Sequence, residues 1–313
     1  MTHDETTRHR LRPRVGVALH LIASPDNVEA PAELERLVKL AIADTGLDFV
    51  ELAPIADDGE RAHLASLLRT AGMEVVFNTG PIVWREELDF GSTDGERRKA
   101  SIRRAIDAIA QAREFGAELV QISPGPDHGD RGPALERTAE AMRELSAEAG
   151  EMLLMCELYD RDNFARRLLG PAAEAAAFVE LVDCPNFGLL LDTSHIVLQG
   201  DDPAAAATLL GDHVVHVHLA NCITDAAVEG AGDQHPYFGV PTGVVDAGVA
   251  HAFVAALVRS GYFDDPLRGR IGAEVKRFPG EDPAALLFNS CRFVRQAADA
   301  VASLRLAVGG VAG

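Results

Sequence analysis

The stretch from Phe187 to His195, with the sequence FGLLLDTSH, gives the clearest indication of the fold. A short apolar run ends here at an acidic residue. A stretch with helical periodicity follows from Pro203 to Leu210, and a second apolar run occupies Val214 to Leu219. This order of strand, helix and strand is typical of a βα unit with parallel strands.

The same alternation extends over the whole chain. The predicted strands are Val15 to His20, Asp48 to Leu52, Met73 to Asn78, Glu118 to Ser123, Met152 to Glu157, Phe187 to Asp192, Val214 to Leu219 and Ile271 to Val275. The predicted helices are Pro31 to Asp44, Glu60 to Ala71, Asp94 to Phe115, Pro133 to Ala149, Pro171 to Val182, Pro203 to Leu210, Ala247 to Ser260 and Asp282 to Leu304. Eight βα units in a chain of 313 residues predict an α/β protein with a single-domain (β/α)8 barrel. A doubly wound open sheet is less favoured, because no Gly-rich loop follows the first strand.

The length, charge and cysteine content of the chain predict its domain organisation, its partners and its cellular compartment. We expect a barrel domain over residues 14–306, with tails at 1–13 and 307–313. The formal charge is 29 − 48 = −19, which disfavours binding to nucleic acid and to anionic membranes. Four widely spaced cysteines, without a CxxC pair, and the absence of a long apolar segment predict a cytoplasmic protein.

Polar residues stand at the predicted carboxyl ends of all eight strands, where a barrel enzyme has its active site. These residues are His20, Glu51, Asn78, Ser123, Glu157, Asp192, His218 and Glu274. Glu157 follows Met155 on one strand face, and Asp192 follows Leu190 on another, so each carboxylate ends an apolar inward row.

Four of these residues predict a metal site. The carboxylates of Glu157, Asp192 and Glu274 would repel one another in one small space unless a cation neutralised them. With the imidazole of His218 they form a mixed oxygen and nitrogen ligand set, which suits Mn²⁺ best, with Mg²⁺ or Co²⁺ as alternatives. Glu157 and Glu274 are then placed to act as general bases on opposite faces of a keto sugar.

Simpler roles exist for several of these side chains. Asp192 could serve only as the N-cap of the next helix, and Glu157 could pair with a loop arginine such as Arg161. His216, which shares a strand face with His218, is expected to be a hydrogen-bonded residue of the barrel interior. His128, just after the fourth strand, is a candidate acid or base or substrate contact.

The chain resembles the xylose isomerase-like barrel family, the sugar phosphate isomerase and epimerase group that includes relatives of endonuclease IV. The matching pieces are Gly46 to Leu52, Cys156-Glu157, Gly188 to His195, His216-Val217-His218 and Ala273-Glu274-Val275. The resemblance implies a metal held by Glu157, Asp192, His218 and Glu274, with His195 contacting substrate. Glu51 and His20 are further expected substrate contacts. Endonuclease IV itself is disfavoured by the charge of −19.

Two departures bear on the substrate. Ketose 3-epimerases of this group have an Arg a few residues after the His of the seventh strand, whereas this chain reads Asn221 to Asp225. The loop from Gly232 to Gly239, which contains His235, and the sequence Glu274-Val275-Lys276 are similar to members that act on 3-keto glycosides, including C-glycoside deglycosidase catalytic subunits. The resemblance therefore adds His235 and Lys276 as substrate contacts. Lys276 would stabilise an enolate, or it pairs with Glu274 or a loop acid.

The predicted function is a divalent-metal-dependent sugar isomerase or epimerase. It would remove a proton next to the carbonyl of a metal-bound keto sugar and form an enediolate. The alternative is elimination from a 3-keto glycoside, by a lyase or dehydratase. The same site could support it, because elimination proceeds through the same enediolate. A non-catalytic sugar-binding subunit and a metal-free hydrolase with two carboxylates are the remaining classes. A homo-oligomer or a small partner subunit is compatible with all of these readings.

Overall fold

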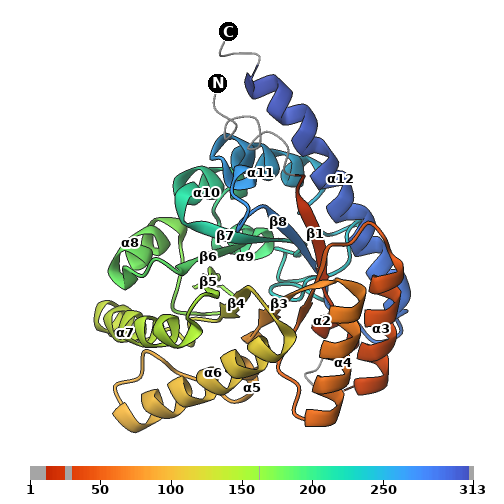
Figure 1. The fold of residues 1–313 in the computed structure, drawn as a ribbon. Coiled ribbons are helices and arrows are strands. Elements are labelled where there is room, and N and C mark those ends of the chain that lie inside the picture. The colour runs from red at the N-terminus through yellow and green to blue at the C-terminus, as the bar shows by residue number, and fades with distance from the viewer. Residues whose placement is uncertain (1–11, 25–29, 162, 310–313) are drawn as a thin grey trace, which may run out of the picture.

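Eight parallel strands close into a barrel in the computed structural model, which describes residues 12–24, 30–161 and 163–309 (Figure 1). The strands are β1 (Arg14–Ala18), β2 (Phe49–Leu52), β3 (Glu74–Asn78), β4 (Leu119–Ile122), β5 (Leu153–Glu157), β6 (Phe187–Asp192), β7 (Val214–Ala220) and β8 (Arg270–Glu274). Each strand pairs with its neighbours in chain order, and β8 pairs with β1 to close the barrel. The predicted (β/α)8 fold is confirmed.

All eight predicted helices are present and surround the strands (Figure 1). They are α3 (Pro31–Ala43), α4 (Asp58–Ala71), α6 (Gly95–Phe115), α7 (Arg131–Ala149), α8 (Ala172–Val182), α10 (Pro203–Leu210), α11 (Ala247–Arg259) and α12 (Pro283–Gly309). Gly72 and Gly116 end α4 and α6 in the left-handed conformation at φ 68°, which glycine adopts without steric cost.

Short helices that the sequence did not predict follow three of the strands. They are α2 (His20–Ala23), α5 (Gly80–Arg85) and α9 (Thr193–Gln199), and two 3₁₀ turns are η1 (Gly211–His213) and η2 (Tyr262–Asp264). The predicted first strand is therefore too long, because β1 ends at Ala18 and His20 begins α2. These helices have at most seven residues, which is too short for a helical periodicity to stand out from an apolar run.

The barrel interior is filled by inward-facing apolar side chains below the polar mouth. One buried cluster contains Phe49, Val76, Leu119, Met155, Leu190 and Val215. Met155 and Leu190 lie in it as the predicted strand faces require. Gly16 gives the ring of Phe49 its space, because a Cβ on Gly16 would lie 2.3 Å from that ring.

An arginine closes the opposite end of the barrel. Arg270 opens β8 with only 1% of its side chain exposed, and its guanidinium lies 3.0 Å from Glu74 and 2.5 Å from Glu118. Arg14 of β1 also pairs with Glu74, at 3.1 Å. This charged network lies at the end of the barrel opposite the polar mouth, so its expected role is to stabilise the fold.

We expect Arg270→Met to lower the free energy of unfolding by about 2 kcal/mol, because it removes the charge-assisted hydrogen bonds of a buried guanidinium to Glu74 and Glu118. Urea denaturation followed by circular dichroism measures this change. Arg103→Met on the exposed face of α6 is the matched control. An unchanged urea midpoint for Arg270→Met would contradict the role of this network.

The predicted tails fall largely beyond the part of the chain that can be described. Residues 1–11 and 310–313 lie outside the described residues, and α12 continues to Gly309. All four cysteines are free thiols, and Cys156, Cys222 and Cys291 are buried. Within residues 12–24, 30–161 and 163–309, no helix is both long and apolar enough to cross a membrane.

Candidate metal centre and active-site cavity

Four consecutive strands bring their last polar side chains together at the mouth of the barrel. Glu157, Asp192, His218 and Glu274 each offer one ligand atom, and these atoms all lie within 4.8 Å of one another. The pairing register explains the convergence, since Asp192 pairs with His218 across β6 and β7, and Glu274 pairs with the end of β7. The four residues predicted as metal ligands therefore form one group.

The atoms that face the centre of this group have no hydrogen-bond partner in the described structure. Glu157 Oε1, Asp192 Oδ2 and His218 Nδ1 are buried and unpartnered. His218 Nδ1 lies 3.0 Å from Glu274 Oε2, 3.6 Å from Asp192 Oδ2 and 3.9 Å from Glu157 Oε1. Buried polar atoms are normally paired, so this convergence of unpaired atoms fits a cation bound between them.

The second oxygen of Glu157 and that of Asp192 are held by hydrogen bonds from neighbouring groups. Glu157 Oε2 accepts hydrogen bonds from Gln121 Nε2 at 2.7 Å and from the Tyr159 hydroxyl at 2.6 Å. Asp192 Oδ1 accepts from the backbone N–H and the hydroxyl of Ser194, both at 2.6 Å. Asp192 is thus the N-cap of α9 through one oxygen, while its other oxygen stays free to bind a metal.

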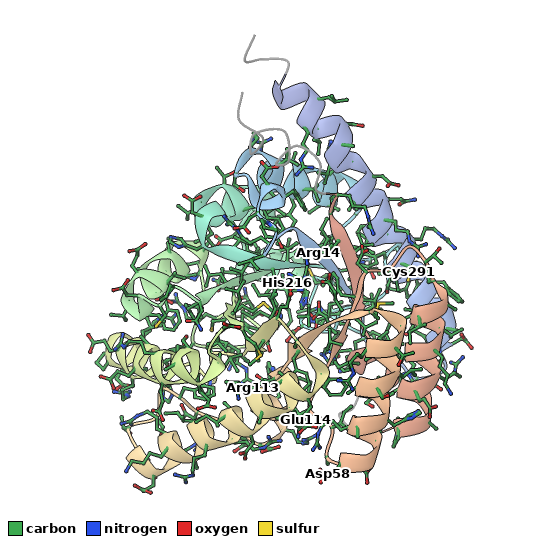
Figure 2. All side chains as sticks on the ribbon, viewed as in Figure 1. Arg14, Asp58, Arg113, Glu114, His216 and Cys291 are labelled. Atoms are coloured by element: carbon green, nitrogen blue, oxygen red, sulfur yellow. The ribbon has the colours of Figure 1, made fainter. Side chains whose placement is uncertain are left out.

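His218 is oriented in the same way by a buried carboxylate. Its Nε2 lies 2.9 Å from Glu51 Oε2, and His216 Nε2 lies 2.7 Å from Glu51 Oε1. A Cβ on Gly272 would come within 2.5 Å of Glu51 Oε1, so a glycine is needed there. Glu51 thereby directs Nδ1 of His218 toward the centre, as carboxylates do for metal-binding histidines. His216 is a hydrogen-bonded residue of the barrel interior, as expected (Figure 2).

The electrostatics of the group reflect this crowding of carboxylates. Burial and the adjacent charge of Glu274 raise the pKa of Glu157 to about 7. Burial acts to raise the pKa of Asp192 too, but His218, His195 and His235 outweigh it and hold that pKa well below its usual range. A divalent cation would relieve the repulsion that raises the Glu157 pKa. The donor set of three carboxylates and one imidazole fits Mn²⁺ or Mg²⁺.

A cavity of about 380 Å³ opens over this group. Its lining includes Glu157, Glu274 and four predicted substrate contacts, His20, His195, His235 and Lys276. The remaining lining residues are Leu21, Asn78, Gly80, Pro81, Trp84, Tyr159, Phe164, Ala165, Ala231, Asp233 and Gln234. His20 Nε2 lies 3.9 Å from Glu274 Oε1.

Two predicted substrate contacts lie elsewhere. Glu51 is fully buried behind His218 and has no access to the cavity. His128 is not among the residues that line the cavity, and its Nε2 lies 2.8 Å from Asp89 Oδ1. Trp84 does line the cavity, and Arg167 stacks 3.1 Å from the centre of its ring.

His195 and His235 flank Asp233, an acid of the long loop after β7. Asp233 Oδ1 lies 2.9 Å from His235 Nε2 and 3.8 Å from His195 Nε2. Burial lowers the pKa of His235, but Asp233 outweighs this effect and the pKa rises to about 10. The pKa of Asp233 falls to about 2, because the two histidines outweigh its burial. This group therefore forms a charged wall of the cavity beside Glu157 and Glu274.

Three residues of the site were not predicted as site residues. Gln121 and Tyr159 hold the catalytic candidate Glu157, and Asp233 holds His235. Strand periodicity offered one signal, since Tyr159 lies two residues after Glu157 and so continues its strand face. Gln121 lies within β4, and Asp233 lies in an irregular loop, so neither stands at a strand end.

The segment after β7 has a structural role where the resembling epimerases have an Arg. Asn221 Oδ1 accepts from the backbone N–H groups of Cys222 and Val245, at 2.9 Å each. Its side chain also donates to the Tyr237 carbonyl at 3.3 Å. Asn221 thus fixes the start and the end of the long loop that brings Asp233 and His235 to the cavity.

A family model for the xylose isomerase-like TIM barrel matches residues 40–297, which is most of the chain. The chain belongs to this family. The match includes all four residues of the candidate metal centre, so the family resemblance inferred from the sequence is confirmed.

The chain is similar to proteins that are named as epimerases. The chain is 26% identical over 249 residues to the D-psicose 3-epimerase of Ruminiclostridium cellulolyticum, covering 75% of this chain and 80% of that protein. It is 25% identical over 244 residues to the L-ribulose 3-epimerase of Mesorhizobium japonicum, covering 75% of each chain. A solved L-ribulose 3-epimerase structure superposes with a TM-score of 0.74 at 23% identity, over 96% of this chain and 98% of that one. The last comparison supports the fold.

Proposed function

We propose that the protein is a divalent-metal-dependent sugar epimerase or isomerase that removes a proton next to the carbonyl of a keto sugar. The observation that carries the proposal is the convergence of Glu157 Oε1, Asp192 Oδ2 and His218 Nδ1, all buried and unpartnered, beside Glu274 Oε2. The similarity to a D-psicose 3-epimerase and an L-ribulose 3-epimerase supports a ketose as substrate.

Glu157, Asp192, His218 and Glu274 would hold the metal, and Mn²⁺ is the ion we expect. A bound divalent ion would act as a Lewis acid that polarises the substrate carbonyl and stabilises the negative charge of an enediolate. The ordered contacts of Gln121, Ser194 and Glu51 to these side chains support a preorganised site.

Glu157 and Glu274 are the proposed acid–base residues. Both line the cavity, on strands separated by β6 and β7, so they approach a bound sugar from different sides. One carboxylate takes the proton from the carbon next to the carbonyl, and the other returns a proton to the opposite face. Return to the same carbon with inverted configuration gives epimerisation, and return to the neighbouring carbon gives isomerisation.

His20, His195 and His235 are the proposed contacts to substrate hydroxyl and carbonyl groups. Each lines the cavity and lies within 4.0 Å of a carboxylate of the metal group. His235 is further oriented by Ser194 Oγ, 3.1 Å from its Nδ1. We assign Glu51 a positioning role behind His218, and no substrate contact to His128, because neither lines the cavity.

Elimination is the second candidate reaction. The cavity continues from Glu157 past Tyr159 to Trp84 and Phe164, whose side chains are 39% and 37% exposed at its edge. These aromatic groups offer room for a substituent on the sugar, and a substituent β to the carbonyl would leave from the same enediolate. The proton that the leaving oxygen needs is available from the histidine of the His235–Asp233 pair.

Tyr159→Phe tests how far the hydrogen bond to Glu157 matters. The variant removes one donor to a charged carboxylate, and we expect the rate of deuterium exchange at the substrate carbon to fall about tenfold. Nuclear magnetic resonance in deuterated water measures this rate. Tyr237→Phe, outside the cavity lining, is the control, and equal rates in the two variants would contradict the positioning role.

The proposed reaction is tested by a substrate panel. Protein loaded with Mn²⁺ is incubated in deuterated water with D-psicose, D-fructose, L-ribulose and a 3-keto glycoside, and the products are followed by nuclear magnetic resonance. Deuterium at the carbon next to the carbonyl is expected, with an epimer or isomer as product. Release of the aglycone would assign the elimination instead, and a panel without any exchange would overturn both candidates.

A further inference from the structure

The cavity contains a positive charge that the proposed reaction does not use. Lys276 lies two residues beyond Glu274, and among the described residues that line the cavity it alone carries an ammonium or guanidinium group. Within the described chain its Nζ makes one contact, 3.3 Å from Gln234 Oε1, and no carboxylate lies within 4.0 Å of it. The expected pairing of Lys276 with Glu274 or a loop acid is therefore absent there.

A lysine without a carboxylate partner is unexpected in a chain whose formal charge is −19, because acidic groups are abundant. Asp233 and Glu274 line the same cavity, yet Asp233 pairs with His235, and Glu274 faces His218. Lys276 is half-buried in the lining of the same cavity, and its partner there is the uncharged side chain of Gln234. An ammonium group that is half-buried and lacks a counter-ion is suited to receive an anion from the ligand.

The backbone fixes the position of this lysine. Its N–H donates to the carbonyl of His235 at 2.9 Å, which joins the end of β8 to the long loop after β7. The next residue, Arg277, donates its backbone N–H to the carbonyl of Leu21 at 3.2 Å. Lys276 is therefore anchored on both sides while its side chain reaches Gln234.

Gln234 adds a second donor. An ammonium group can only donate, so the side-chain oxygen of Gln234 faces Lys276 and its Nε2 group points elsewhere. Gln234 also lines the cavity, and within the described residues its side chain makes a hydrogen bond only through this oxygen, so its Nε2 group is free to donate to a ligand. The Nε2 group is bonded to the same carbon as the oxygen that contacts Lys276, so one ammonium and one amide N–H group are available to the two oxygens of a carboxylate. A phosphate group usually takes more donors, such as an arginine fork or a helix N-terminus.

We propose that Lys276 and Gln234 form a carboxylate-binding subsite, so that the substrate is an acidic keto sugar. The inference rests on the proposed function and narrows its substrate class. In it the carbonyl end of the sugar lies at the metal group, and the carboxylate lies beside Lys276 at the β8 side of the cavity.

Equilibrium binding tests the subsite without requiring turnover. Calorimetry on the Mn²⁺-loaded protein compares D-fructose with D-fructuronate, which has a carboxylate in place of the terminal hydroxymethyl group. We expect D-fructuronate to bind at least tenfold more tightly. In Lys276→Met the ratio of the affinity for D-fructuronate to that for D-fructose should fall at least tenfold. In Lys39→Met, on the exposed face of α3, this ratio should stay at the wild-type value. Equal binding of the two sugars, or a preference that survives Lys276→Met, would overturn the subsite.

Two further variants and one further ligand complete the binding test. Lys276→Arg, which keeps the charge, should retain most of the preference, and Gln234→Leu should reduce it about threefold; these variants carry the test if Lys276→Met does not fold. Tighter binding of D-fructose 6-phosphate than of D-fructuronate would overturn the assignment to a carboxylate. Failure of the proposed function is distinguishable, because it appears as absent deuterium exchange with every sugar rather than as a lost binding preference.

Discussion

Replacing Glu157 or Glu274 by Gln should lower the rate of deuterium exchange next to the substrate carbonyl about 10³-fold. The amide cannot accept the proton, and it is a weaker ligand for a divalent ion, so both the base and the metal charge are affected. Each side chain is nearly buried in the cavity wall, and glutamine has almost the same shape as glutamate. The fold should therefore survive, which circular dichroism checks.

The matched control for these variants is Glu140→Gln on the exposed face of α7. It removes the same charge from the surface and should exchange deuterium at the wild-type rate. Wild-type exchange in Glu157→Gln or Glu274→Gln would contradict the assignment of the two acid–base residues.

Removing the metal should abolish exchange and also lower the melting temperature by about 5 °C. Three carboxylates whose ligand atoms lie within 4.8 Å of one another repel in the metal-free state. A cation that binds only the folded protein stabilises it by about 2.7 kcal/mol at a hundred times its dissociation constant. In a chain of this size that stabilisation corresponds to a few degrees.

Differential scanning calorimetry before and after treatment with a chelator measures the temperature shift. Added Mn²⁺ should restore both the melting temperature and the exchange rate. Activity that persists after exhaustive chelation would favour a hydrolase with two carboxylates and no metal.

The barrel could be predicted because each strand and each long helix has its own periodic pattern. The strand faces follow from alternation, which placed Met155 and Leu190 below Glu157 and Asp192. The short helices α2, α5 and α9 have no such pattern, because four to seven residues do not complete two helical turns. The end of β1 was misplaced for this reason.

The four ligand positions could be predicted from strand ends, but the contacts around them could not. Glu51 and His218 are 167 residues apart, and they meet only because β1 pairs with β8 to close the barrel. Asp233 and His235 are two residues apart, but the irregular loop that carries them brings Asp233 to within 3.8 Å of His195, on a different element. Sequence spacing does not determine such contacts, whereas a closed barrel does.

Titration of Mn²⁺ into the metal-free protein, followed by calorimetry, tests the central claim most directly. We predict one ion per chain in the wild type. Asp192→Asn, which keeps the helix cap but weakens the free ligand atom, should reduce the affinity at least a hundredfold. A wild-type protein that binds no divalent ion, or an Asp192→Asn variant that binds Mn²⁺ as tightly as the wild type, would contradict the account.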